Sequence, residues 1–122
     1  MLKKTITYVD YNGNERVEDF YFNLTKAEAT EMELSVEGGL TKKLEEIVNS
    51  ENNKEIIALF KEIILKAYGE KSQDGKRFIK SEELSEAFSQ TEAFSELFME
   101  LALDEKAAAD FVNGILPANI NR

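Results

Sequence analysis

The stretch from Glu70 to Ser81 contains the residue types that a calcium-binding loop would need. Glu70, Ser72 and Asp74 precede Gly75 at the spacing of the first, third and fifth ligands of an EF-hand loop. Such a loop needs about seven oxygen ligands and a bidentate acid at its twelfth position, and Ser81 occupies that position here. Lysines within the stretch add positive charge where a cation would sit. We therefore predict a polar turn before a capped helix, and no metal site.

The chain has few of the residues that usually carry acid–base or nucleophilic catalysis. The sequence contains no cysteine and no histidine, which removes thiol nucleophiles, disulfides, cysteine zinc sites and imidazole bases. Adjacent acids such as Glu45 and Glu46 are typical of a solvated helix face, and the chain has no phosphate-binding glycine loop and no Ser-x-x-Lys motif. We therefore predict no catalytic residues, no cofactor and no enzymatic activity.

Length and composition favour a single domain spanning residues 1–122. Of the 122 residues, 43% are hydrophobic and 32% are charged, which is enough apolar material for a core and too much for intrinsic disorder. No apolar run approaches the roughly 18 to 20 residues of a membrane span, and no apolar stretch of a signal peptide follows the N-terminus. These features predict a cytoplasmic protein.

The negative charge is concentrated in one part of the chain. The sequence has 24 acidic and 15 basic residues, a net charge of -9. Residues 81–110 contain nine acids and a single basic residue, Lys106, so this segment alone carries a net charge of −8. Because phosphates and anionic lipids recruit basic proteins, we expect neither nucleic acid nor a membrane as the partner.

Residues 1–24 are predicted to form a β-hairpin. Polar and apolar residues alternate over 2–10 and 15–24, which is the period of a strand with one buried face. Asn12-Gly13 lies at the centre of the connection and favours a type I′ turn. Phe20 and Phe22 fall on one face of the second strand, and we expect this face to pack on helices.

Helices are predicted over residues 25–68. Thr25 and Glu28 form a capping box at the start of the first helix, which Gly38-Gly39 ends. A short helix follows over about 41–48. The next, over about 54–68, has a wide apolar stripe that includes Phe60, and we expect it to be the most buried element.

Residues 69–80 are predicted to form a loop or a short second hairpin, and residues 81–117 to form acidic helices. Ser81, Thr91 and Asp104 are the expected N-caps, and Gly114 and Pro117 end the last helix. The fold class is therefore α+β, with an N-terminal β-hairpin followed by a bundle of five or six α-helices.

The acidic C-terminal helices also carry phenylalanines at helical spacing. The simplest interpretation of such a stripe is core. The alternative is that part of it forms a groove or ridge for a partner, with acids around it that steer basic molecules. This candidate partner-binding surface consists of Phe88, Glu92, Phe94, Glu96, Phe98, Glu100 and Phe111.

The sequence resembles a known family over essentially the whole chain, and two parts show this most clearly. One is the segment Glu92-Ala93-Phe94-Ser95-Glu96-Leu97-Phe98-Met99-Glu100-Leu101-Ala102 with its continuation over 104–117. The other is the hairpin leading into Phe22-Asn23-Leu24-Thr25-Lys26-Ala27-Glu28, with the Gly38-Gly39 break after it. Together they resemble the tail assembly chaperones of long-tailed bacteriophages, in particular those that infect Gram-positive bacteria.

The resemblance implies a role in tail morphogenesis in the host bacterial cytoplasm. Such proteins bind the long tape-measure protein, keep its hydrophobic helices soluble, help to recruit tail-tube subunits and are not part of the mature virion. Self-association into rings or spirals fits the same role, and many relatives have a longer, frameshifted form. The family supplies no catalytic residues.

A second class of function stays open at this stage. The acids of residues 81–110 also suit a small acidic regulator or a DNA mimic, although the interleaved phenylalanines fit that class less well. Added salt would separate the two, because a mimic should lose nearly all affinity whereas an apolar contact should persist.

Overall fold

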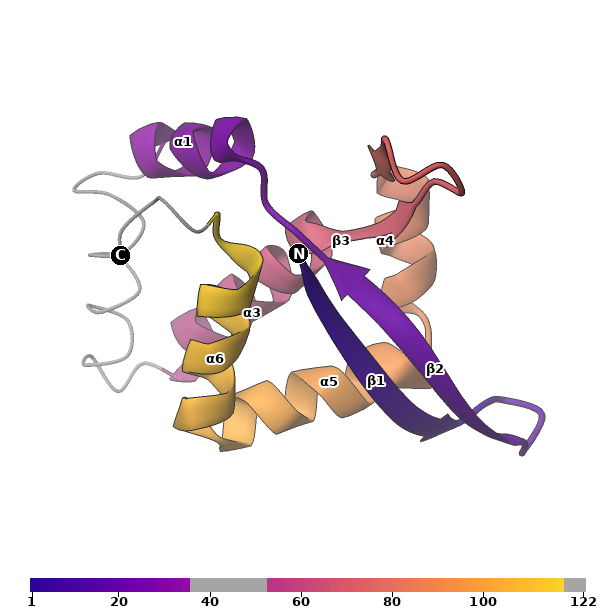
Figure 1. Cartoon of the computed structure of the whole chain (residues 1–122). Coiled ribbons are helices and arrows are strands. Elements are labelled where there is room, and N and C mark those ends of the chain that lie inside the picture. Colours follow the sequence, from indigo (N-terminus) through magenta and orange to yellow (C-terminus); the bar gives the residue numbers. More distant parts are fainter. Residues whose placement is uncertain (36–52, 118–122) are drawn as a thin grey trace.

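The structure, a computed structural model, describes residues 1–35 and 53–117 (Figure 1). Four strands and five helices lie in these two ranges. In chain order they are β1 (Leu2–Val9), β2 (Glu15–Phe22), α1 (Lys26–Ser35), α3 (Asn53–Ala67), β3 (Tyr68–Lys71), β4 (Phe78–Ile79), α4 (Glu82–Ser89), α5 (Glu92–Leu103) and α6 (Glu105–Ile115). The α+β class and the N-terminal hairpin followed by helices are confirmed.

The strands form one antiparallel sheet in the order β1-β2-β3-β4. β1 pairs with β2 along its whole length, from Leu2 opposite Phe22 to Val9 opposite Glu15. β2 pairs with β3 only at its end, through Tyr21 and Phe22. β3 and β4 make a second hairpin, which was one of the two alternatives for residues 69–80.

The turn of the first hairpin differs from the prediction. The amide of Gly13 donates to the carbonyl of Asp10 (3.0 Å), so Tyr11 and Asn12 are the central residues, and Gly13 follows them with φ 82. A turn followed by a left-handed glycine is the three-residue loop with a bulge, and not the two-residue type I′ turn. The carboxylate of Asp10 decides between them, because it accepts hydrogen bonds from the amides of Asn12 and Asn14 (both 2.9 Å).

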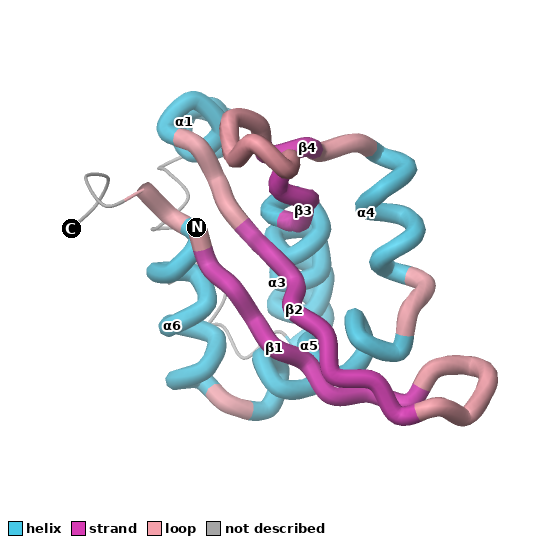
Figure 2. The backbone as a smooth tube through the Cα atoms, turned by 45° about the vertical axis from the view of Figure 1, so that its right-hand side comes forward, coloured by secondary structure: helices cyan, strands magenta, loops and turns pink. Residues whose placement is uncertain are grey.

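The helices cover one face of the hairpin (Figure 2). Alternation places Ile6 and Phe22 on the covered face, where both are buried. Thr7 and Val17, opposite each other in the register, lie on the other face, and Val17 is 62% exposed. α5 packs against β1, and α6 follows α5 and contacts the start of the same strand.

Aromatic rings join the sheet to the helices. Phe22 is completely buried and contacts Tyr68, Phe88 and Phe111, with the ring centroids of Phe22 and Phe111 5.3 Å apart. Tyr68 and Phe88 stack at 4.2 Å. Phe60, as predicted, is buried in the same core. Since these rings come from β2, β3, α4 and α6, the core connects segments that are far apart in the sequence.

The predicted N-caps are confirmed. The hydroxyl groups of Ser81 and Thr91 accept hydrogen bonds from the amides of Leu84 and Phe94, and the carboxylate of Asp104 accepts from two amides of α6. The helix predicted over 41–48, the Gly38-Gly39 break and the last five residues lie outside the described residues.

Candidate functional site

The structure distributes the seven predicted surface residues between the core and the surface. Phe88 and Phe111 are 3% and 2% exposed and belong to the core described above. Phe94, Phe98 and Glu92 are half-buried, whereas Glu96 and Glu100 are exposed. In this conformation, therefore, only α5 presents predicted surface residues to a partner.

On α5 the phenylalanines and glutamates lie on nearly opposite sides. Residues two positions apart on an α-helix are separated by about 200° around the axis, and this spacing relates Glu92 to Phe94 and Glu96 to Phe98. The phenylalanine side of α5 faces α4, because the ring of Phe94 packs edge-on against the ring of Phe88, with 5.6 Å between the ring centroids. The predicted ridge of phenylalanines surrounded by acids is therefore two separate surfaces.

The glutamate side of α5 carries two exposed apolar residues that the prediction did not include. Met99 and Leu103 are 48% and 78% exposed, and helical spacing places them beside the acids. We call this surface the α5 strip, and it consists of Glu92, Glu96, Met99, Glu100 and Leu103. It combines apolar contact area with negative charge.

β1 borders the α5 strip. The ammonium group of Lys4 forms an ion pair with the Glu100 carboxylate (3.1 Å). At the other end, the carboxylate of Glu92 accepts a hydrogen bond from Tyr11 and raises the pKa of that phenol. Glu96 lies between them on the helix and makes no ion pair within the described residues. Its charge is therefore available to a partner.

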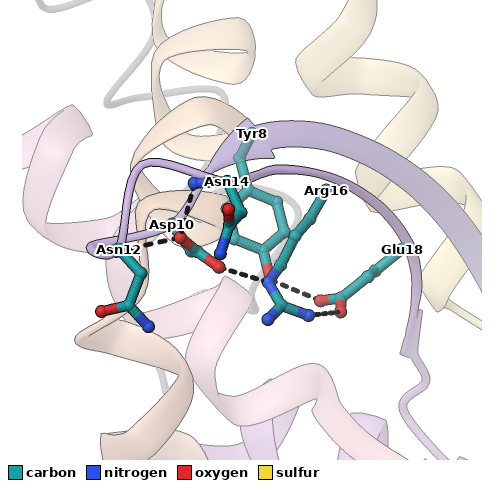
Figure 3. A network of polar contacts seen from close by, with 6 residues as sticks. All are labelled: Tyr8, Asp10, Asn12, Asn14, Arg16 and Glu18. Carbon is teal, nitrogen blue, oxygen red and sulfur yellow. Dashed lines mark hydrogen bonds and ion pairs between the residues drawn. The ribbon is translucent and has the colours of Figure 1, made fainter.

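A polar network orders the hairpin end that carries Tyr11 (Figure 3). The guanidinium of Arg16 binds the carboxylate of Asp10 (2.5 Å) and that of Glu18 (3.4 Å), and Glu18 also accepts a hydrogen bond from the phenol of Tyr8. The hydrogen bond from Arg16 lowers the pKa of Asp10, and the hydrogen bond to Glu18 raises the pKa of Tyr8. Through these contacts Arg16 joins the turn at Asp10 to Glu18 of β2, and the network holds the end of the hairpin together.

The loop that resembles a calcium site is a turn of the second hairpin. The carboxylate of Asp74 accepts hydrogen bonds from the Ser72 hydroxyl (2.7 Å) and the Lys76 amide (3.0 Å), and both lower the pKa of Asp74. Gly75 follows with φ 74. The prediction of a polar turn before the helix capped by Ser81 is confirmed.

The spacing of Met99 and Leu103 in the sequence could have identified them as part of this surface. Met99 and Leu103 are four residues apart and fall on the glutamate side when the helix is divided at 100° per residue. That division separates them from Phe94 and Phe98. It does not show which side is exposed, because this depends on the packing of α5 against β1 and α4.

Comparisons with known proteins give one family. The model of a family described as phage tail assembly chaperone matches residues 1–122, which is the whole chain. Searches of curated proteins and of solved structures found no match. Among the described helices, none is long and apolar enough to cross a membrane. The family match confirms the resemblance seen in the sequence, and the origin in phages of Gram-positive bacteria stays a prediction.

Proposed function

We propose, from the premise that this chain belongs to the family of phage tail assembly chaperones and so acts in tail assembly, that it binds the tape-measure protein. In this proposal it keeps the hydrophobic segments of that protein soluble and helps to recruit tail-tube subunits. It acts in the cytoplasm of the host bacterium, which we expect to be Gram-positive, and leaves before the virion is complete.

The observation that carries the proposal is the α5 strip. A protein that keeps another protein in solution needs exposed apolar surface for the contact and charge to prevent its own aggregation. Met99 and Leu103 supply the apolar surface, and Glu96 and Glu100 supply the charge beside it. Burial of a Met or Leu side chain contributes about 1.5–3 kcal/mol, so these two residues are a substantial part of a reversible contact.

The charge of residues 81–110 supports the same proposal. A net charge of −8 on these residues raises the rate of encounter with basic segments and depends on ionic strength. An apolar contact depends on salt much less. We therefore expect a complex that forms faster at low salt and persists at high salt, whereas a DNA mimic would lose nearly all affinity at high salt.

Co-expression tests the proposal. The tape-measure protein encoded in the same genome is expressed alone and together with this chain, and its soluble fraction and its co-purification with this chain are measured. We expect it to be soluble and bound only when both proteins are made. If its solubility does not change and no complex forms, the proposal is wrong and the acidic regulator takes its place.

A pair of double variants tests the role of the α5 strip. Met99→Gln with Leu103→Gln removes two apolar groups that are 48% and 78% exposed. The matched control, Ile57→Gln with Leu34→Gln, removes groups that are 47% and 82% exposed on other helices. We expect most of the tape-measure protein to be insoluble when it is co-expressed with the first variant, and to stay soluble when it is co-expressed with the control. Equal losses would remove the strip from the proposal.

A further inference from the structure

Among the residues that the structure describes, β1 is an edge strand with an open side. Within the described residues its eight-residue backbone pairs with β2 alone. Its register with β2 is continuous, without a bulge or a proline from Leu2 to Val9. Natural edge strands are usually short, bulged or interrupted by proline, because an open edge is a template for another strand. The length and regularity of this edge therefore favour pairing with a further strand.

The hairpin geometry shows which backbone groups face the open side. The amide of Asp10 donates to the carbonyl of Asn14 (2.9 Å), so Asp10 is a position that faces β2. Such positions alternate along an antiparallel strand, and this places the outward N–H and C=O groups at Lys3, Thr5, Thr7 and Val9. The backbone groups of β2 alternate in the same way. The amide of Asn23, just after β2, points away from β1 and donates to the carbonyl of Ala67 (2.9 Å).

The α5 strip lies beside β1. On one side of α5, Phe94 packs on Phe88, and Phe88 packs on Phe20 of β2. On the other side, Glu100 forms an ion pair with Lys4 of β1 (3.1 Å). The strip thus lies next to β1, on the side of α5 that is turned away from Phe94. A strand added to β1 would run over it, with every second side chain directed toward its acids and apolar residues.

We propose that β1 accepts an extended segment of the partner protein as an additional antiparallel strand. The main-chain hydrogen bonds of such an addition supply affinity, and alternate side chains supply specificity. The net charge of −8 on residues 81–110 and the exposed Met99 and Leu103 select a segment in which basic and apolar residues alternate. The net charge of -9 on each chain opposes a second copy in that place. The inference rests on the proposed function, and it specifies how the partner would bind to this chain.

Hydrogen exchange of the complex tests the inference. The amides of Thr5, Thr7 and Val9 are followed by mass spectrometry or NMR in the free chain and in the complex with the tape-measure protein. We expect fast exchange in the free chain and exchange about tenfold slower or more in the complex. The amides of Val17 and Asp19, which face the opposite edge of the hairpin, serve as the internal control and should not change.

Each other outcome overturns the inference in a different way. If the β1 amides are protected in the free chain, the edge is already occupied by another part of the chain or by a second copy. If the complex forms and these amides still exchange rapidly, the proposed function stands and the strand addition is wrong. If no complex forms, the proposed function and the inference fail together.

A matched pair of proline variants gives a second test. Thr7 and Val17 are opposite each other and exposed, but their amides face opposite edges of the hairpin. Proline is tolerated where an edge amide faces solvent. We expect Thr7→Pro to weaken binding about tenfold or more and Val17→Pro to change it by no more than about twofold, because only the first blocks the β1 edge. Equal effects would overturn the inference.

A charge variant keeps the test decisive if Thr7→Pro does not fold. Glu96→Lys reverses a charge on the α5 strip, and Glu86→Lys, on an exposed residue of α4, is its matched control. We expect Glu96→Lys to weaken binding about fivefold at low salt, with a smaller effect at high salt, and Glu86→Lys to weaken it less. A Glu96→Lys complex with undiminished affinity would contradict the selection of a basic segment.

Discussion

At the scale of single residues, Gly69 is where the two hairpins meet. It is opposite Tyr21 in the pairing of β2 with β3, and it is buried. A Cβ atom at this position would approach the carbonyl oxygen of Ile79 and the ring of Phe78, both at 2.7 Å. The oxygen belongs to the backbone of β4 and cannot rotate away, so the position accepts only glycine without a shift of the second hairpin.

We therefore predict that Gly69→Ala lowers the free energy of unfolding by about 1–3 kcal/mol, the usual cost of overpacking. Urea denaturation followed by circular dichroism measures it. Gly13→Ala is the control, because Gly13 has open space around it and only its φ of 82 opposes a side chain, which costs about 1–2 kcal/mol. A Gly69→Ala variant as stable as the parent would show that β4 moves freely.

At the scale of elements, Lys80 ties the start of α1 to the end of the second hairpin. Its ammonium group donates to the carboxylate of Glu28 (2.7 Å) and to the carbonyl of Asn23 (2.6 Å). Glu28 also accepts a hydrogen bond from the amide of Thr25 (2.9 Å), which completes the predicted capping box. Burial raises the pKa of Glu28, but the hydrogen bonds from Lys80 and Thr25 outweigh this effect, so the pKa lies below the usual 4.5 of a glutamate.

This pKa gives a stability prediction with a definite sign. Because the pKa of Glu28 is lower in the folded state, its contribution is present at neutral pH and is lost as the pH falls below 4.5. Glu28→Gln keeps an acceptor for Thr25 and removes the charge opposite Lys80. We expect it to cost about 1 kcal/mol near neutral pH and less at about pH 3.

Urea denaturation at both pH values measures this difference. The control is Glu31→Gln on the same helix, because Glu31 is exposed; we expect its cost to be small at either pH. A cost for Glu28→Gln that does not depend on pH would mean that the ion pair with Lys80 does not stabilise the folded state.

At the scale of the whole molecule, one core serves the hairpins and the helices together. Phe22 of β2 contacts rings of β3, α4 and α6, and Ala93, Leu97 and Leu101 of α5 are buried in the same core. A two-stranded hairpin alone is marginal in water. The first hairpin therefore depends on the helices for its stability.

We predict that the chain unfolds in one cooperative transition. Tyrosine fluorescence reports mainly on the hairpins, because Tyr8, Tyr11, Tyr21 and Tyr68 lie in or beside the strands, and far-ultraviolet circular dichroism reports mainly on the helices. The two urea transitions should coincide. Two separated midpoints would instead divide the single domain expected over residues 1–122.

Local sequence alone determined the elements whose signals are local. The alternation of residues gave the strands of the first hairpin, and Thr25, Ser81, Thr91 and Asp104 marked helix starts correctly, because a cap binds amides two or three residues away. The type of the first turn was missed, since it depends on the Asp10 carboxylate and not on Asn12-Gly13.

The tertiary structure decided what depends on contacts between distant segments. A stripe of phenylalanines has the same spacing whether it is core or surface, and only packing against β2 buries Phe88 and Phe111 while leaving Met99 and Leu103 exposed. The pairing of β3 with β2 and the placement of the α5 strip beside β1 likewise join segments far apart in the sequence. The sequence determined the elements and the family, because the signals for both lie in residues that are close together in the chain. Which faces stay exposed to a partner depends on how the whole chain buries its apolar surface.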